Sequence, residues 1–336
     1  MSGTIFTFTT PPVHPTTNHL TLSDHWDHLR ARVGINRSGH LVEPGLYSLG
    51  NPTPDSPVFV TANYTLSFDA VRSSLDDWMK CYILVLDTKG INVWCAAGKG
   101  TFGTGELVNR IHITGLADKV NHRVLILPQL GATGVSAHEL KKLTGFRVEY
   151  GPVRAADLSA YLETHKATPE MRRVQFNVID RMVLFPVELV KVLPYLLVIS
   201  IILYFASGPL AAAGAAAAML AGIFLFPILL PFIPTKDFSS KGFILGGFVA
   251  LPFALAAYRY GIEPAPCIHI SRAITPMLLM PPVTAFISLN FTGSTTFTSV
   301  TGVRKEISTY TRVMAWMFAS GTATLIILAI LRITGW

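Results

Sequence analysis

Charged residues and cysteines are both scarce in this sequence. Asp, Glu, Lys and Arg make up 14% of the 336 residues, whereas about a quarter is usual for a soluble globular domain. The three cysteines, Cys81, Cys95 and Cys267, lie far apart. Their number and spacing argue against a disulfide framework, a self-contained zinc site and an iron–sulfur cluster, which normally needs four thiolates, and they fit a reducing compartment.

Two other signals are absent. The net charge is +7, but no basic tract is interleaved with aromatic residues, so the sequence gives no indication of nucleic-acid binding. The N-terminus, Met1 to Phe6, has no basic stretch followed by an apolar one. We therefore expect no signal peptide and an N-terminal head that stays in the cytoplasm.

The deficit of charge is confined to the second half of the chain. Residues 1–181 have the composition of a soluble protein, whereas residues 183–333 are almost entirely apolar. Five segments in the apolar half approach the length of about 20 residues that crosses the hydrocarbon core of a bilayer: 187–207, 209–233, 242–260, 270–291 and 313–333. The sequence thus predicts an all-α transmembrane domain of five helices at 187–336, in contact with membrane lipid.

Basic residues around these segments predict the orientation in the membrane. Most of them lie before the first segment, between the second and third, and between the fourth and fifth: Arg172, Arg173, Arg181, Lys236, Lys241, Arg304, Lys305 and Arg312. Loops rich in Lys and Arg stay on the cytoplasmic side. The sequence therefore predicts a multi-pass protein of the cytoplasmic membrane with its head in the cytoplasm.

Residues 58–165 alternate between strand and helix patterns. Short β-branched or apolar runs predict strands, and segments with helical periodicity lie between them. We expect strands at 58–64, 81–87, 91–95, 124–130 and 146–150, and helices at 67–79, 105–116, 135–143 and 155–164. The alternation predicts a Rossmann-like, doubly wound α/β sheet, whose ligand would lie beyond the carboxyl ends of the strands.

The segments on either side of this domain lack the alternation. Residues 1–57 are rich in Pro, Thr, His and Gly, and we expect an irregular N-terminal lead-in with a short helix at Leu22–Val33. Residues 166–186 form an amphipathic pattern. They predict a connector that could lie along the membrane surface.

The segment Ile91–Gly103 contains the most informative residues. It places Cys95 at the end of an expected strand, just before small residues that let a flat ligand approach the backbone. One interpretation is dinucleotide binding, because Gly98 to Gly103 match G-x-G-x-x-G and Asp118 follows at a suitable distance. A second is an inert buried thiol, the usual state of a cysteine that ends an apolar strand; Cys81 is interpreted in this way.

The neighbours of Cys95 favour a functional thiol. Trp94 and the small residues after Cys95 surround the sulfur at an expected helix start, which favours the thiolate over the thiol. A third interpretation is therefore that Cys95 ligates a metal held in a planar macrocycle.

Several segments carry a resemblance to known corrinoid proteins. Asn92-Val93-Trp94-Cys95-Ala96-Ala97-Gly98-Lys99 resembles the signature of the corrinoid proteins of mercury methylation, the HgcA family. Thr61–Asp69 is similar to a segment of the corrinoid iron–sulfur proteins of acetyl-CoA metabolism. Leu127–Val135 and Tyr150–Ala155 resemble loops of the family, with Thr133 where the family usually has Pro. Five apolar segments and Asn290–Thr295 match the family layout; residues 1–57 have no clear counterpart.

The resemblance implies a cobalamin-type corrinoid in the base-off, Cys-on state. Cys95 would be the catalytic residue and the lower axial ligand of cobalt, and the chain has no D-x-H-x-x-G motif to supply a histidine instead. The other residues that the resemblance places around the corrinoid are Thr61, Asn63, Asn92, Val93, Trp94, Ala96, Ala97, Gly98, Lys99, Thr101, Gln129, Leu130, Gly131, Ala132, Gly134, Val135, Gly151, Pro152, Val153 and Arg154.

The resemblance also implies an activity and partners. The chain would be a methyltransferase that passes a cobalt-bound methyl group to Hg(II) and so makes methylmercury. Methyltetrahydrofolate or a methylated protein would donate the methyl group, and a small ferredoxin with two 4Fe–4S clusters, HgcB, would supply electrons. Two alternatives remain open: a corrinoid methyl carrier of one-carbon or acetyl-CoA metabolism, and a non-catalytic membrane subunit that binds a nucleotide.

Overall fold

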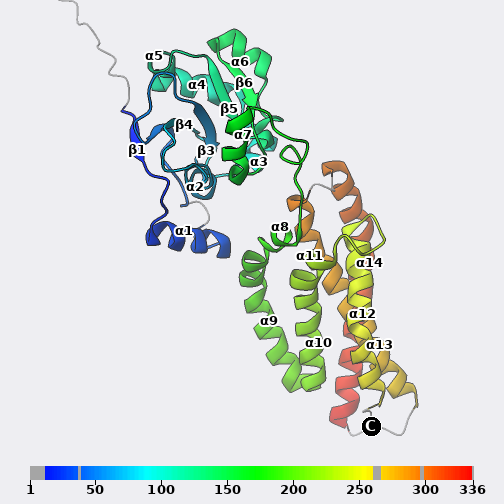
Figure 1. The fold of residues 1–336 in the computed structure, drawn as a ribbon. Coiled ribbons are helices and arrows are strands. Elements are labelled where there is room, and N and C mark those ends of the chain that lie inside the picture. The colour runs from blue at the N-terminus through cyan, green and yellow to red at the C-terminus, as the bar shows by residue number, and fades with distance from the viewer. Residues whose placement is uncertain (1–11, 37–38, 260–265, 296–298, 335–336) are drawn as a thin grey trace, which may run out of the picture. The chain divides into compact units, whose positions relative to one another are not determined.

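Two compact units make up the chain in the computed structural model, which describes residues 12–36, 39–259, 266–295 and 299–334 (Figure 1). The first unit, called the head, comprises residues 1–175, and the helical unit comprises residues 176–336. The division between them falls inside the predicted connector 166–186.

The head contains a mixed sheet of six strands in the order β1-β2-β4-β3-β5-β6. Neighbouring strands are parallel except β2 and β4, which are antiparallel. The strands are β1 His14–Thr16, β2 Gly45–Leu49, β3 Val58–Ala62, β4 Cys81–Leu86, β5 Val124–Leu127 and β6 Arg147–Tyr150. The chain leaves β3 for β4 on one side and then returns to β5 on the other side of β3, so the order of the strands reverses between β3 and β5.

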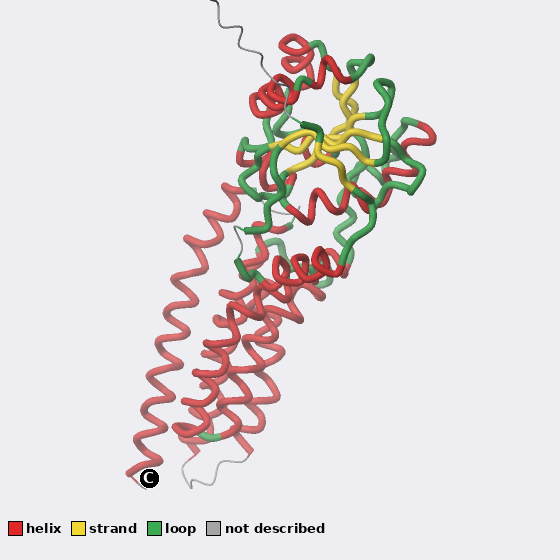
Figure 2. Tube along the Cα trace, turned by 90° about the vertical axis from the view of Figure 1, so that its left-hand side faces the viewer, coloured by secondary structure: helices red, strands yellow, loops and turns green. Residues whose placement is uncertain are grey.

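Helices cover both faces of this sheet, which lies in the middle of the head (Figure 2). Along β4, Ile83 and Val85 face one layer while Leu84 and Leu86 face the other, as the two-residue period of a strand requires. The first layer is α2 (Thr65–Ser73) with α7 (Leu158–Thr164), and the second is α3 (Val93–Lys99), α4 (Thr104–Thr114), α5 (Leu116–Lys119) and α6 (Ala137–Thr144). Burial on both faces explains why the central strands are continuous apolar runs.

The described part of residues 1–57 has more regular structure than predicted. The helix expected at Leu22–Val33 is confirmed as α1, with a Thr21 capping box and a left-handed Gly34 at its end. However, β1 and β2 come from the same segment and join the sheet, so the prediction of an irregular lead-in was wrong there. Leu46 and Leu49 of β2 contribute to the two layers of core, and their burial fixes the segment to the sheet.

The predicted strand at 91–95 was also wrong. Asn92 has an extended backbone, and its side-chain Oδ1 accepts a hydrogen bond from the Cys95 backbone N at 2.9 Å. Asn92 is thus the N-cap of α3, because an asparagine side chain at this position satisfies a free N–H of the first turn. Cys95 consequently lies in the first turn of a helix rather than at the end of a strand.

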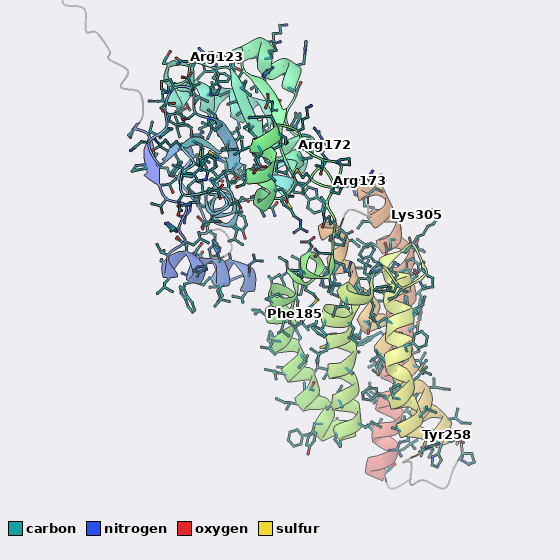
Figure 3. The ribbon with its side chains drawn as sticks, in the orientation of Figure 1. Arg123, Arg172, Arg173, Phe185, Tyr258 and Lys305 are labelled. Atoms are coloured by element: carbon teal, nitrogen blue, oxygen red, sulfur yellow. The ribbon has the colours of Figure 1, made fainter. Side chains whose placement is uncertain are left out.

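The helical unit contains five helical stretches long and apolar enough to cross a membrane among the described residues: Val178–Ser207, Pro209–Leu229, Phe238–Arg259, Pro266–Gly293 and Thr301–Leu331. Its elements are α8 Val178–Met182, α9 Phe185–Ser207, α10 Pro209–Leu220, the π-helical η3 Ala221–Leu225, α11 Phe226–Leu229, α12 Phe238–Arg259, α13 Pro266–Ser288, η4 Leu289–Ser294 and α14 Val300–Thr334. Within this unit, Phe185 and Lys305 lie toward one end, and Tyr258 lies at the other (Figure 3). The basic residue Lys305, near the start of α14, is thus remote from the α12 end that carries Tyr258.

Glycines bring α12 and α13 into backbone contact. A Cβ on Gly242 would lie 2.5 Å from the Ala285 Cα, and one on Gly246 would lie 2.6 Å from the Pro281 Cα. The four-residue spacing places both glycines on one face of α12, as in other close-packed apolar helix pairs. This close approach packs α13 tightly despite its three internal prolines.

Polar side chains at the start of the helical unit are turned inward. Arg181 of the predicted connector is buried and donates to the carbonyl oxygens of Phe176 and Ile228. Glu188 is buried, pairs with Lys191 at 2.6 Å and accepts from Asn290 Nδ2 at 3.2 Å. Asn290 belongs to the segment that resembles the corrinoid family and lies in η4. Its contact with Glu188 of α9 shows that this segment helps to pack η4 against α9.

Candidate functional site

A crevice opens at the carboxyl ends of β3 and β5. Phe59 and Ile126 are the one registered pair between these two strands. In an open α/β sheet, the point where the strand order reverses is where a ligand binds. A cavity of about 300 Å³ lies there, lined by Phe59, Val60, Thr61, Ser67, Ala70, Val71, Asn92, Val93, Trp94, Ile126, Leu127, Pro128, Leu130, Pro152, Val153, Ala155 and Leu158.

The start of α3 lies against this cavity. Its first residues, Val93 and Trp94, line the wall together with the N-cap Asn92. Cys95 comes next; it is exposed and does not line the cavity itself. Ala96 and Ala97 are buried and attach the other side of the helix to the sheet. The helix therefore presents a cysteine to solvent next to a wall of cavity-lining residues.

Asn63, which the resemblance places at the cofactor, holds the loop that leads to α3. It is buried at the end of β3, and its Oδ1 accepts hydrogen bonds from Thr88 N at 3.0 Å, Thr88 Oγ1 at 2.9 Å and Gly90 N at 3.0 Å. Its Nδ2 donates to Asp87 Oδ1 at 3.4 Å. Asn63 is thus a clamp that fixes residues 87–90.

Charged side chains of α4 and of the loop itself complete its support. Glu106 Oε1 accepts from the Asp87 backbone N at 2.9 Å and pairs with Arg110 at 2.7 Å. Burial alone would raise the pKa of Asp87, but hydrogen bonds from Lys89 and the charge of Lys89 outweigh it, so this pKa lies below its usual value. The carboxylate of Asp87 is therefore ionised over the physiological pH range.

The loop after β5 packs closely against α3 and the residues that follow it, because two of its residues are glycines. A Cβ on Gly134 would lie 2.1 Å from the Phe102 carbonyl oxygen and 3.0 Å from the Ala97 Cα, and one on Gly131 would lie 2.5 Å from the Phe102 ring. Such distances leave no room for any larger residue. These glycines therefore allow the loop, with its short helix η1 (Gln129–Gly131), to pack directly on the segment that follows Cys95.

The glycine motif of the dinucleotide interpretation has a different geometry. Gly98 lies inside α3, Gly100 ends α3 in the left-handed conformation, and Gly103 is the N-cap of α4. The motif therefore joins two helices, whereas a dinucleotide fingerprint joins a strand to a helix. This arrangement argues against a nucleotide site at residues 98–103.

The remaining predicted residues divide into three groups. Thr61, Leu130, Pro152 and Val153 line the cavity with residues of α3. Val135 and Gly151 are buried in the framework, where the Val135 carbonyl accepts from the Tyr150 hydroxyl at 2.9 Å. The others are partly or fully exposed around these elements: Gly98, Lys99, Thr101, Gln129, Ala132 and Arg154.

Sequence reasoning missed the part of the cavity wall that comes from α2, η2 and α7. Ser67, Ala70 and Val71 of α2 line the cavity, as do Ala155 of η2 (Ala155–Asp157) and Leu158 of α7. The helix after β3 starts at the crevice, so the residues of its first two turns could have been assigned from the predicted topology.

Comparisons with known proteins concern the head. The profile of the family described as CO dehydrogenase/acetyl-CoA synthase delta subunit matches residues 34–162. The head is similar to this family. The match begins at residue 34 and so includes β2. It therefore extends into residues 1–57, for which the sequence motifs alone gave no counterpart.

Curated relatives match the same part of the chain. The gamma subunit of the acetyl-CoA decarbonylase/synthase complex of Methanopyrus kandleri is 40% identical over 124 residues, which are 36% of this chain and 26% of that protein. The corresponding subunit of Archaeoglobus fulgidus is 37% identical over 123 residues, with the same shares. That of Methanocaldococcus jannaschii is 35% identical over 130 residues, 38% of this chain and 26% of that protein. The chain thus spans about a quarter of the length of these relatives.

Metal-ligating side chains are dispersed in the described ranges. There, no three His, Cys, Asp or Glu side chains come together in a group that could hold a metal ion. Cys81, Cys95 and Cys267 are all free thiols.

The two cysteines of the head are expected to differ strongly in reactivity. Burial in β4 raises the pKa of Cys81 to about 12, so only about one molecule in ten thousand carries its thiolate at pH 8. Cys95 is exposed. Iodoacetamide at pH 8 should therefore alkylate Cys95 in the native protein and Cys81 only in denaturant, as peptide mass spectrometry would record. Equal labelling of the two native thiols would contradict this assignment.

Proposed function

We propose that the head binds a corrinoid over α3, with the Cys95 sulfur as the lower ligand of its cobalt, and that the chain is a membrane-anchored protein of methyl transfer. The observation that carries this proposal is the exposed Cys95 thiol beside the cavity at the β3–β5 crevice. The similarity of residues 34–162 to subunits of acetyl-CoA synthesis supports a place in one-carbon chemistry.

The surface around Cys95 suits a large planar ligand. Gly98 lies three residues after Cys95 and therefore on the same side of α3. A Cβ added to Gly98 would meet nothing within 4 Å, and the same is true of Gly100. Neither glycine is needed for contacts inside the head, unlike Gly131 and Gly134. Their absent side chains leave the surface beside the sulfur open to a flat ring.

The residues present can divide the work of holding a corrinoid. Bound at this site, the corrinoid supplies a cobalt atom that accepts and releases a methyl group. Cys95 would ligate the metal, and Asn92 would keep the first turn of α3 in place through its bond to the Cys95 backbone N. Thr61, Leu130 and Val153 would contact the part of the cofactor that enters the cavity.

Two functions are candidates, and they differ in the acceptor of the methyl group: Hg(II) or an acetyl-CoA synthase. The segment Asn92–Lys99 and the apolar half of the chain favour Hg(II), because both match the layout of the mercury-methylating family. A thiolate below the cobalt donates more electron density than an imidazole and so suits transfer of the methyl group to a soft cation. The curated relatives favour the second candidate, a methyl carrier of acetyl-CoA metabolism, since they are subunits of such a complex.

Purification of the full chain from a corrinoid-producing host tests the proposal. We expect a coloured protein with the absorption of a bound corrinoid, and methyl release to Hg(II) from the methylated protein. Transfer to an acetyl-CoA synthase but not to Hg(II) would support the second candidate. A colourless protein that does not take up added cobalamin would overturn both.

Substitutions at Gly98 should separate folding from cofactor binding. Gly98→Ala is expected to raise the free energy of unfolding of the head by about 0.5–1 kcal/mol, because Ala is a better helix former and its methyl group meets no other atom. Gly98→Leu should keep the fold but lower corrinoid affinity at least tenfold, because its side chain projects beside Cys95.

Hydrogen exchange and titration with hydroxocobalamin measure the two effects at Gly98. The matched control is Gly105→Leu in α4, where an added Cβ also meets nothing within 4 Å. Unchanged corrinoid affinity in Gly98→Leu would place the ligand elsewhere.

The proposal also assigns a location and partners. The five apolar helices would span the cytoplasmic membrane, with the head in the cytoplasm. Electrons would come from a ferredoxin of the HgcB type, and the methyl group from methyltetrahydrofolate or a methylated protein.

A further inference from the structure

Helix α1 has the reverse of the usual amphipathic arrangement. None of its residues is buried, and its charged face is directed to the head. Asp24 pairs with Arg72 at 3.0 Å, Asp27 with His40 at 2.8 Å, and His28 with Asp69 at 2.7 Å. Because Asp69 and Arg72 belong to α2, these pairs hold α1 against the outside of the head, beside α2 (Figure 1).

The opposite face of α1 is an apolar stripe. Leu22, Trp26, Leu29 and Val33 follow at intervals of four, three and four residues, which places them within an arc of about 60° on a helix of 3.6 residues per turn. The side chains of Leu22, Trp26 and Leu29 are 88%, 61% and 50% exposed. A capped, ion-paired helix thus displays its apolar residues to the solvent.

We propose that this stripe, Leu22/Trp26/Leu29/Val33, inserts into the interfacial layer of an anionic lipid bilayer. Arg30 and Arg32 of the last turn flank it on opposite sides by helical spacing. An apolar stripe with Trp and Leu between basic residues is typical of helices that lie in the membrane surface, and Trp prefers the boundary between lipid and water.

The rest of the chain tethers the head to a bilayer. Thirteen residues, 165–177, join the last helix of the head to the first of the helical unit, so they span at most about 45 Å. This step rests on the proposed membrane location of the helical unit. A tethered surface binds at a high effective concentration, so a four-residue stripe that would be weak in a free protein suffices here.

The test uses the full chain in nanodiscs of phosphatidylcholine and phosphatidylglycerol, with either ordinary or brominated acyl chains. Bromine quenches a tryptophan that enters the lipid. The Trp26 contribution is the emission lost in Trp26→Phe, and the Trp316 contribution is the emission lost in Trp316→Phe; Trp316 is 78% exposed in α14. We expect brominated lipid to remove most of both contributions.

Two charge variants test the stripe itself. Leu29→Glu should restore Trp26 emission in brominated lipid, whereas Ser23→Glu, the same charge on an exposed position outside the stripe, should not. Both positions are exposed, so hydrogen exchange of the sheet should be unchanged in both variants.

The outcomes separate this inference from the proposed location. Quenching of Trp316 without quenching of Trp26 would overturn the insertion of the stripe into lipid, whether the stripe is then exposed to water or covered by protein. The proposed membrane location of the helical unit would still stand. Quenching of neither would overturn both. Equal effects of the two charge variants would show that the apolar stripe is not what holds α1 in lipid.

Discussion

Cys95→Ala is expected to abolish methyl transfer from the protein while the head stays folded. The Cys95 side chain is exposed, and the hydrogen bond that joins Cys95 to Asn92 Oδ1 is donated by its backbone N, which alanine keeps. Alanine is also favourable inside a helix. The variant thus removes the proposed lower ligand without a packing defect. Methyl release to Hg(II) or to a synthase, measured on corrinoid-loaded protein, should fall below detection.

Controls for this substitution are available within the chain. Cys267→Ala removes the other exposed thiol and should retain full activity. Cys95→His offers an imidazole ligand instead of a thiolate, and its absorption spectrum should differ from that of the parent. Full activity in Cys95→Ala protein that still carries corrinoid would refute a catalytic role for the sulfur.

Asn63→Leu is expected to lower the free energy of unfolding of the head by about 2 kcal/mol. Leucine has a similar shape but removes the Asn63 Oδ1 acceptor of Thr88 N, Thr88 Oγ1 and Gly90 N. Thr88 N and Oγ1 keep the carbonyl oxygens of Leu86 and Ile91 as partners, so the main loss is at the partly buried Gly90 N–H, and a donor without a partner costs about 1–3 kcal/mol. Hydrogen exchange of β3 and β4 in the full chain, followed against urea, measures the loss.

The matched control is the same substitution at an exposed asparagine. Asn121 donates to Asp55 at 3.0 Å on the surface of the head, so Asn121→Leu should change stability by less than about 0.5 kcal/mol. Corrinoid affinity should also drop in Asn63→Leu, because residues 87–90 lead directly into α3. Stability equal to that of the Asn121 variant would show that Asn63 is not a clamp.

The sequence pattern was sufficient for elements whose signal is local. Strands β3, β4, β5 and β6 were predicted within three residues at each end. The first three are short apolar runs between helical segments, and β6 (Arg147–Tyr150) alternates charged residues with Val148 and Tyr150. The expected helix Leu22–Val33 has the bounds of α1, where Thr21 and Gly34 cap the two ends.

Errors arose where the signal was long-range or ambiguous. Strand β2 is five residues between Pro44 and Gly50, and it is stabilised by pairing with β4, more than 30 residues later. Strand propensity depends strongly on such context. Ile91–Cys95 is apolar enough for a strand, but a short apolar run does not distinguish strand from helix. The Asn92 N-cap was the missed signal, and its effect was to move Cys95 into a helix.

The location of the candidate site was predictable from the sequence, but the contacts of its individual residues were not. Placing the ligand at the carboxyl ends of the strands predicted the edge of the sheet where the cavity lies. Sequence could not tell that Asn63, Gly131 and Gly134 contact other parts of the head, because their partners Thr88, Phe102 and Ala97 become neighbours only in the folded chain. A residue near a site can therefore serve it by supporting the loop that carries the reactive group.

The glycine face of α12 limits how the helical unit can rearrange. Where glycines let the backbones of two helices touch, the helices cannot slide past each other gradually. They must first separate, or shift by a whole helical repeat. We therefore expect α12 and α13 to travel together in any conformational change. Relative movement is then left to helices without such notches, such as α9, whose principal packing neighbour is α10.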